Sequence, residues 1–513
     1  MFYSIMFPTK EQHDRQVTRE VPAYFHDLNL DKIIDAALET KERFELNNIF
    51  YSPVEDKEII TYRQDILREI EEKDLRKTMG DFSKTVHEIY SGLSEIRREL
   101  SSYDPSLNNH LARGRLFDGA ERYCGEVSLL TEKLSSFQPC STGLRNLLDY
   151  LKEYCSSPGF MRLASDTKRL REAFSKVSYC MVLQKNTIQI RKDEKVTSLA
   201  GQIAVCFDKF RTGEIANYKQ DVSEEPLASH IEAATLQLLS KQYKPLFSEL
   251  ESFCAEHFRF EDRIISMFSR EIQFYLSWLD FIEPVKQAGL PFCLPSLSDT
   301  IDGVFCSDGF DLALARLIKN DIVTNNFALR SPERIIVVTG PNQGGKTTFA
   351  RAFGQLHYLA ALGLSVPGNE ATVFLFDNIF THFGREEDLS ALEGKLKDDL
   401  IRLRTVLDQA SDRSIVIINE IFTSTVIDDA LVLGRFMIQS LVSTGTPAVI
   451  ITFLDELAVF GSETVSMMSA VLESDPVIRT FKITRKPPDG LAYAGHIAGK
   501  HSLTYEQICE RLK

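Results

Sequence analysis

The sequence predicts an α + α/β protein, in which a mostly helical region is followed by an α/β domain with a mainly parallel sheet. Over roughly the first 310 residues, apolar side chains recur at helical spacing. After residue 330, short β-branched runs appear instead, and helix-length segments separate the first three of them. This alternation is typical of buried parallel strands joined by crossover helices. The runs are "RIIVVTG" (334–340), "SIVIINE" (414–420), "PAVIITF" (447–453) and "VIRTFKI" (477–483).

The helical region contains three long apolar stripes. The first passes through Phe82, Val86, Ile89, Leu93, Ile96 and Leu100 in alternating steps of four and three residues. The second covers 231–254, where Pro245 predicts a kink. The third covers 261–285. Between the first two, "NTIQIRK" (186–192) alternates like a strand, so we expect long helices with one small extended insertion.

Composition is that of an ordinary globular protein, with 43% hydrophobic and 26% charged residues among 513. Nothing resembles a membrane span, and the short apolar opening lacks the basic region of a signal peptide. The nine cysteines form no C-x-x-C pair, so neither a zinc site nor a disulfide framework is expected. These features predict a cytoplasmic protein.

The net charge of −14 opposes broad non-specific DNA binding. Residues 161–195 differ, because this segment contains nine basic and four acidic residues, which gives it a net charge of +5. One interpretation is a solvated helix face followed by a strand. The other is a local phosphate contact, for which Lys185, Arg191 and Lys192 are the candidates.

A phosphate-binding loop follows the first β-branched run. Gly340, Gly345, Lys346 and Thr347 fit G-x-x-x-x-G-K-[ST], and Gly344 adds a glycine. Such glycines let backbone N–H groups turn toward phosphates, as the N-terminus of the next helix also does. Lys346 is expected to reach the β- and γ-phosphates and the Thr347 hydroxyl to bind Mg²⁺, which predicts ATP or ADP binding by Gly340, Pro341, Asn342, Gln343, Gly344, Gly345, Lys346, Thr347 and Thr348.

A second polar element lies at the end of "SIVII". Two acids are usual there, but this chain has Asn419 and Glu420. Asn419 keeps an oxygen for a water-mediated Mg²⁺ contact and loses a full charge, so metal affinity should fall. Glu420 remains available as the general base for ATP hydrolysis. The alternative is a site that binds ATP without turning it over.

Several segments together resemble the MutS family. "TGPNQGGKTT" (339–348) resembles its "TGPNMGGKST" loop, and "NEIFTST" (419–425) resembles a shortened "DEIGRGTST". "SVPGNEA" (365–371), "DNIFTHFGREEDLS" (377–390) and "DGLAYAGHIAG" (489–499) resemble family segments in the same order. Upstream, "FYSPVEDKEIITYRQDIL" (50–67) resembles the start of the family's helical core.

The resemblance implies a dimer of ATPase domains, here a homodimer, with long lever helices leading to a clamp around DNA. It also implies adenine contacts at Ile322, Asn325 and Ile483, where two aliphatic side chains replace the family's stacking partners. Two family residues are replaced as well: Gly394 stands where a serine reaches across the dimer, and Phe453 where a histidine responds to phosphate. Weak coupling between the two sites is therefore expected.

The expected organisation is an N-terminal extension (1–45), a helical lever region (46–310) with a clamp-like insertion near 161–230, and an ATPase domain (311–513). The helical core starts near residue 45, so no mismatch-reading domain is expected. Two functions fit: a slow Mg²⁺-dependent ATPase that moves levers on DNA without reading mismatches, or a nucleotide-gated scaffold for a protein partner. A small-molecule kinase is excluded because no acceptor-site motif appears.

Overall fold

The computed structural model describes residues 2–14, 21–101, 109–184, 187–192, 235–318, 321–384, 395–472, 475–488 and 502–511. They form two compact units. One combines residues 1–76, 139–144 and 270–513, and the other combines 77–138 and 145–269. The boundaries expected at residues 45 and 310 stay predictions.

Within its described residues, the second unit is helical apart from one hairpin, as expected. The stripe from Phe82 to Ile96 is buried along α6. Antiparallel strands β1 (Tyr179–Gln184) and β2 (Thr187–Lys192) form the hairpin, which confirms the strand expected at 186–192. The helices that lie in this unit, wholly or in part, are α6 (Lys73–Ser101), α7 (Asn109–Phe137), α8 (Thr142–Cys155), α9 (Pro158–Ser175), α12 (Lys244–Glu256) and α13 (Arg263–Gln287).

Pro245 does not kink a helix, which corrects the expectation from the sequence. Residues 235–242 form a helical segment, and α12 then starts anew at Lys244 with Pro245 in its first turn. Tyr243, between them, has φ −112° and ψ 41°, outside the helical range. Proline suits a first turn because the N–H group it lacks would have no partner within the helix there.

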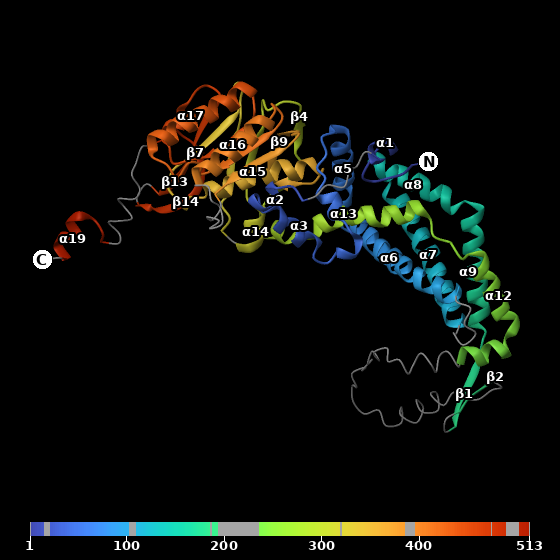
Figure 1. The fold of residues 1–513 in the computed structure, drawn as a ribbon. Coiled ribbons are helices and arrows are strands. Elements are labelled where there is room, and N and C mark those ends of the chain that lie inside the picture. The colour runs from blue at the N-terminus through green and yellow to red at the C-terminus, as the bar shows by residue number, and fades with distance from the viewer. Residues whose placement is uncertain are drawn as a thin grey trace. The chain divides into compact units, whose positions relative to one another are not determined.

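The first unit contains a six-stranded sheet in the order β10-β11-β12-β7-β13-β14. Strands β7, β13 and β14 of this sheet are labelled in Figure 1. The first five strands are parallel, and only β14 runs antiparallel to its neighbour, so the sheet is mainly parallel as expected. The strands are β7 (Ile335–Thr339), β10 (Ile379–Phe383), β11 (Ile415–Asn419), β12 (Ala448–Ile451), β13 (Thr464–Leu472) and β14 (Asp475–Arg485).

Helices cover both faces of this sheet. On one face, Val416 and Ile418 share an apolar core with α16 (Lys395–Gln409) and α17 (Ile427–Thr444). On the other face, α15 (Lys346–Ala361) packs so closely that a Cβ atom at Gly354 would lie 2.9 Å from Ile417. Alternate residues of β11 therefore pack against the helices on opposite faces of the sheet. Both sets must be apolar, which explains the uninterrupted apolar runs in the sequence.

A second sheet, unforeseen from the sequence, has the order β4-β9-β5-β6, and β3 pairs with β8. The other elements of this unit are α1 (Lys10–Asp14), α2 (Tyr24–Asp27), α3 (Leu30–Leu38), η1 (Glu42–Phe44), α4 (Asn47–Phe50), α5 (Lys57–Ile70), β3 (Phe292–Cys293), β4 (Ser296–Ser298), β5 (Phe305–Gly309), α14 (Leu312–Ile318), β6 (Asn325–Ala328), β8 (Val366–Pro367), β9 (Glu370–Phe374), η2 (Asp455–Val459) and α19 (Tyr505–Arg511).

N-terminal segments of the same unit hold α15 along its length. Gln355 donates to the Leu28 carbonyl (2.9 Å), and Tyr358 donates to the Phe50 carbonyl (2.5 Å). At the end of the helix, the buried guanidinium of Arg63 donates to the Leu362 carbonyl (3.1 Å), where a cation suits the helix dipole. The helix that begins at Lys346 is thus fixed by residues some 300 positions earlier in the chain.

Candidate nucleotide-binding site

The glycine-rich loop joins β7 to α15, as the sequence predicted. Gly340 and Gly345 have φ of 110° and 88°, values that favour glycine. Gly344 is needed for a different reason, because a Cβ atom there would lie 2.1 Å from the Ser469 hydroxyl oxygen. That hydroxyl donates to the Gly344 carbonyl (2.7 Å), so a residue of β13 holds the loop in place. No sequence motif marks Ser469 as part of the site.

Lys346 bridges the loop. Its side chain is only 5% exposed, and Nζ donates to the carbonyls of Gly340 (2.9 Å) and Pro341 (3.0 Å) and to the Asn342 side chain (3.3 Å). Burial lowers the pKa of Lys346, while the carboxylate of Glu420, 4.0 Å away, opposes that shift. An ammonium held against the loop by two backbone carbonyls and one amide oxygen is positioned to meet anionic phosphate oxygens.

Thr347 and Asn419 meet beside the loop. The Thr347 hydroxyl donates to Asn419 Oδ1 at 3.1 Å, which joins the first turn of α15 to the end of β11. Both groups are neutral oxygen ligands of the kind that Mg²⁺ accepts, and Mg²⁺ commonly keeps several water molecules. The pair therefore fits a water-mediated Mg²⁺ site, although it supplies no negative charge.

Glu420 follows directly after β11. Its side chain is 42% exposed, and its backbone has φ 57° while its N–H group donates to the Ile451 carbonyl (3.0 Å). A positive φ is uncommon for glutamate and is typical of residues that surrounding structure holds in a functional orientation. Of the described acids, Glu420 is the one that forms an ion pair with Lys346.

Of the residues expected around the base, Asn325 lies on β6, Ile483 lies on β14, and Ile322 precedes β6 in the chain. The amide of Asn325 is engaged at both ends: Nδ2 donates to the Phe481 carbonyl (3.3 Å) and Oδ1 accepts from the Ile483 N–H (2.7 Å). The Ile483 side chain is buried, whereas that of Ile322 is half-buried. Phe481, which no sequence motif marked, is an exposed residue of β14 whose backbone approaches the loop at Gly345.

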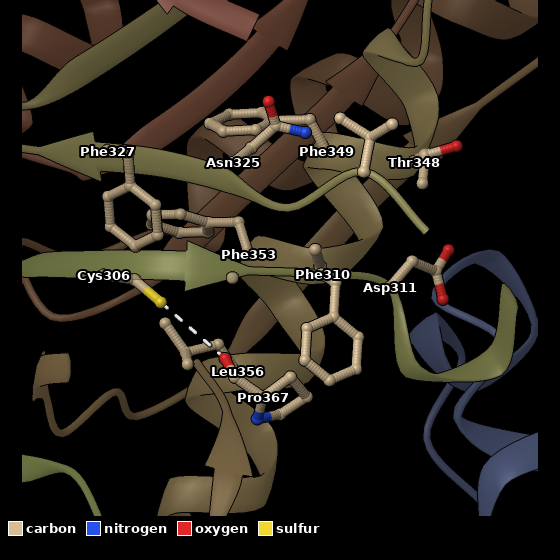
Figure 2. Close-up of a pocket in the computed structure, with 13 residues that line it drawn as sticks. Cys306, Phe310, Asp311, Asn325, Phe327, Thr348, Phe349, Phe353, Leu356 and Pro367 are labelled. Atoms are coloured by element: carbon tan, nitrogen blue, oxygen red, sulfur yellow. Dashed lines mark hydrogen bonds between the residues drawn. The ribbon is translucent and has the colours of Figure 1, made fainter. Parts of the chain in front are cut away.

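A small pocket lies beside the first turns of α15 (Figure 2). Its cavity volume is about 20 Å³, enough for about one water molecule. Aromatic side chains form much of its wall, and Asn325 and Thr348 of the predicted site also line it. Asp311 at its edge accepts from Gln355 (2.9 Å), and burial raises the pKa of this carboxyl. The aromatic residues are Phe310, Phe327, Phe349 and Phe353.

The residues proposed for DNA lie in the helical unit. Arg191 and Lys192 end β2, opposite Cys180 and Tyr179. Lys185 lies outside the described residues, as do Gly394, residues 385–390 of the segment 377–390, and residues 489–499. Phe453 lies two residues after the end of β12 and is 49% exposed.

The basic character of α9 is largely neutralised by its neighbours. Arg162 pairs with Glu256 of α12 (2.5 Å) and Arg169 with Glu249 of the same helix (2.9 Å). Arg171 pairs with Asp118 and Glu121 of α7 and packs over the Phe117 ring. The net charge counted along the sequence therefore overstates the positive potential of this surface.

Comparisons with known proteins agree with the motifs. Residues 336–496 match the family model of MutS domain V. The endonuclease MutS2 of Thermus thermophilus is 29% identical over 190 residues, which are 37% of this chain and 25% of that protein. The DNA mismatch repair protein MutS of Syntrophomonas wolfei is 34% identical over 136 residues (26% and 15%), and that of Psychrobacter cryohalolentis is 31% identical over 143 residues (28% and 14%). The chain thus aligns with a quarter or less of each relative.

Among the described residues, no helix combines the length and the apolar character that a membrane crossing requires.

Proposed function

We propose that this chain is a MutS-type ATP-binding protein and a slow Mg²⁺-dependent ATPase, because residues 336–496 match MutS domain V and the similar proteins are MutS and MutS2. One observation carries the proposal: the buried Lys346 ammonium crosses the glycine-rich loop 4.0 Å from Glu420. The ATPase activity is assigned to residues 311–513.

Each residue of the site has a distinct role in this proposal. Lys346 and the loop N–H groups hold the β- and γ-phosphates, and Thr347 and Asn419 hold Mg²⁺ through water. Mg²⁺ bound there would neutralise charge on the phosphate oxygens. The Glu420 carboxylate takes the proton of the water that attacks the γ-phosphorus, and ADP leaves as the β–γ oxygen–phosphorus bond breaks. Hydrolysis is slow because Asn419 lacks a charge.

The proposal is tested by titrating ATP into the wild-type protein and the Lys346→Ala variant by calorimetry. Removal of the ammonium should reduce ATP affinity at least a hundredfold, because a charge-assisted contact to phosphate is lost in a partly desolvated loop. Gly159→Ala is the control, since a Cβ atom there meets nothing within 4 Å. Equal ATP affinity in the wild-type and Lys346→Ala proteins would remove the site assignment.

We extend the proposal to a homodimer whose nucleotide state moves the helical region (46–310) on DNA. Calorimetry with an ATP analogue, combined with light scattering, tests the dimer. Weak coupling predicts two sites of similar affinity, because Phe453 and Gly394 replace polar family residues. A monomer in all nucleotide states would contradict the dimer.

A second function is favoured by the ion pairs of α9, because they leave little free positive charge on its arginines. In this alternative the protein is a nucleotide-gated scaffold whose helical unit holds a protein partner and no DNA. Gel shifts on duplex, mismatched and branched DNA distinguish the two functions. Real phosphate contacts must weaken steeply as salt is raised from 50 to 200 mM, whereas the scaffold predicts no shift at either concentration.

A further inference from the structure

Phe481 occupies an irregular part of β14. Ser469 of β13 pairs with Ile483, and Val471 pairs with Arg479, so two residues of β13 span the same distance as four of β14. Phe481 lies in the middle of this bulge with φ 58°. A positive φ is rare for a bulky side chain. Bulges beside binding sites commonly re-aim a side chain.

The bulge brings Phe481 against the glycine-rich loop. A Cβ atom built on Gly345, the residue before Lys346, would lie 3.5 Å from the Phe481 carbonyl oxygen and 3.6 Å from its Cα and Cβ atoms. The Phe481 side chain is nevertheless 48% exposed. Within the described part of the chain, its ring stacks on no other aromatic ring. An exposed apolar side chain thus projects from a strained backbone position beside the start of α15.

The polar side chains next to Phe481 are already engaged. Asn325 uses both ends of its amide on the backbone of β14. The Thr324 hydroxyl donates to Asp308 (3.0 Å), and the Lys482 ammonium donates to the Thr324 carbonyl. These groups fix the strand and leave little capacity to distinguish the hydrogen-bonding edge of one base from that of another.

We propose that the Phe481 ring stacks on the base of the nucleotide whose phosphates the loop holds, and that the site accepts purine nucleoside triphosphates in general, GTP as well as ATP. This inference rests on the proposed function. A ring that offers only its face recognises any flat base, because every base has a π-face. Discrimination between bases requires hydrogen bonds to their edges. Here the phosphates supply affinity and Phe481 positions the base.

The test compares ATP, GTP and inorganic tripolyphosphate by calorimetry, in wild-type, Phe481→Ala and Ile478→Ala proteins. Wild type should bind ATP and GTP within about threefold of each other. Phe481→Ala should weaken both by about tenfold, the lower range of a lost base–aromatic stack, and leave tripolyphosphate unchanged because it has no base. Ile478→Ala is the matched control, since Ile478 lies on the same strand and is 50% exposed.

A Phe481→Trp variant gives an independent readout. The chain has a single tryptophan, Trp278, which is buried, so a second indole at position 481 would dominate any change in emission. Stacking predicts that ATP and GTP quench this emission and tripolyphosphate does not. Equal quenching by all three ligands would contradict stacking.

The outcomes separate the two proposals. Unchanged ATP and GTP affinity in Phe481→Ala overturns the role of the ring, and ATP binding more than thirtyfold tighter than GTP overturns the base tolerance. In both cases phosphate binding by the loop stands. Failure of wild type to bind any of the three ligands overturns this inference together with the proposed function.

Discussion

Glu271 should make the stability of the first unit depend on pH in an unusual direction. Its carboxylate is buried and accepts hydrogen bonds from the Ser4 hydroxyl and the Ile5 N–H, both at 2.8 Å. Burial raises the pKa of Glu271 from 4.5 to about 7, although these two hydrogen bonds and the charges of Arg63 and Arg270 oppose the shift. Tyr62 and Tyr275 are its other titratable neighbours.

The direction of this pH dependence follows from the raised pKa of Glu271. The folded protein binds this proton more tightly than the unfolded chain, so the stabilisation is fully present below pH 4.5 and is lost as the pH rises through about 7. With these two values, linkage gives a loss of about 2.5 kcal/mol in the free energy of unfolding between pH 5 and pH 8. Glu271→Gln cannot titrate and should lack this loss.

The assay is urea unfolding at pH 5, 6, 7 and 8, followed by the fluorescence of Trp278, which lies on α13 in the same unit. The difference in unfolding free energy between wild type and Glu271→Gln should change by about 2.5 kcal/mol across this range. Glu283→Gln is the control on the same helix, because a hydrogen bond from Gln287 lowers the pKa of Glu283 and so moves its titration away from the pH range of the assay. Parallel pH curves for wild type and Glu271→Gln would refute the reasoning.

Three further substitutions test the site. Asn419→Asp restores a negative charge beside Thr347 and should lower the Mg²⁺ concentration needed for half-maximal ATP turnover; an unchanged Mg²⁺ dependence would mean that this side chain does not serve the metal. Glu420→Gln should keep ATP affinity within about threefold and reduce phosphate release by roughly 10²- to 10⁴-fold, and turnover at the parent rate would place the base elsewhere. Gly344→Ala should weaken ATP binding more than tenfold in a calorimetric titration, because its methyl group would lie 2.1 Å from the Ser469 hydroxyl; normal affinity would show that β13 yields without disturbing the loop.

Local patterns predicted a good part of the fold. The β-branched runs at 334–340, 414–420 and 447–453 became β7, β11 and β12, and the glycine-rich loop lies between β7 and α15. These signals succeeded because burial on both faces leaves an uninterrupted apolar run, which is visible in a single stretch of sequence.

Contacts between distant segments could not be predicted in this way. The sequence of strand β13 is "TVSMMSAVL". No pattern in it predicts that Ser469 donates a hydrogen bond to a loop 125 residues earlier. The bulge at Phe481 depends on the register between β13 and β14, which their local sequences do not specify. Pro245 was misjudged for a related reason, because the same residue kinks a helix in its interior and begins one at its first turn.

The binding of α15 by N-terminal segments has a consequence for how the protein is made. Arg351 donates to the Asp27 carbonyl 324 residues earlier, and Gln355 donates to the Leu28 carbonyl 327 residues earlier. A ribosome adding about 5–20 residues per second needs about 15–65 s to synthesise that interval. During this time Phe25 and Leu28, which are fully buried in the finished protein, have no native partner on α15. The nascent chain therefore carries an uncovered apolar segment through most of its translation, and this period is when a chaperone would be needed most.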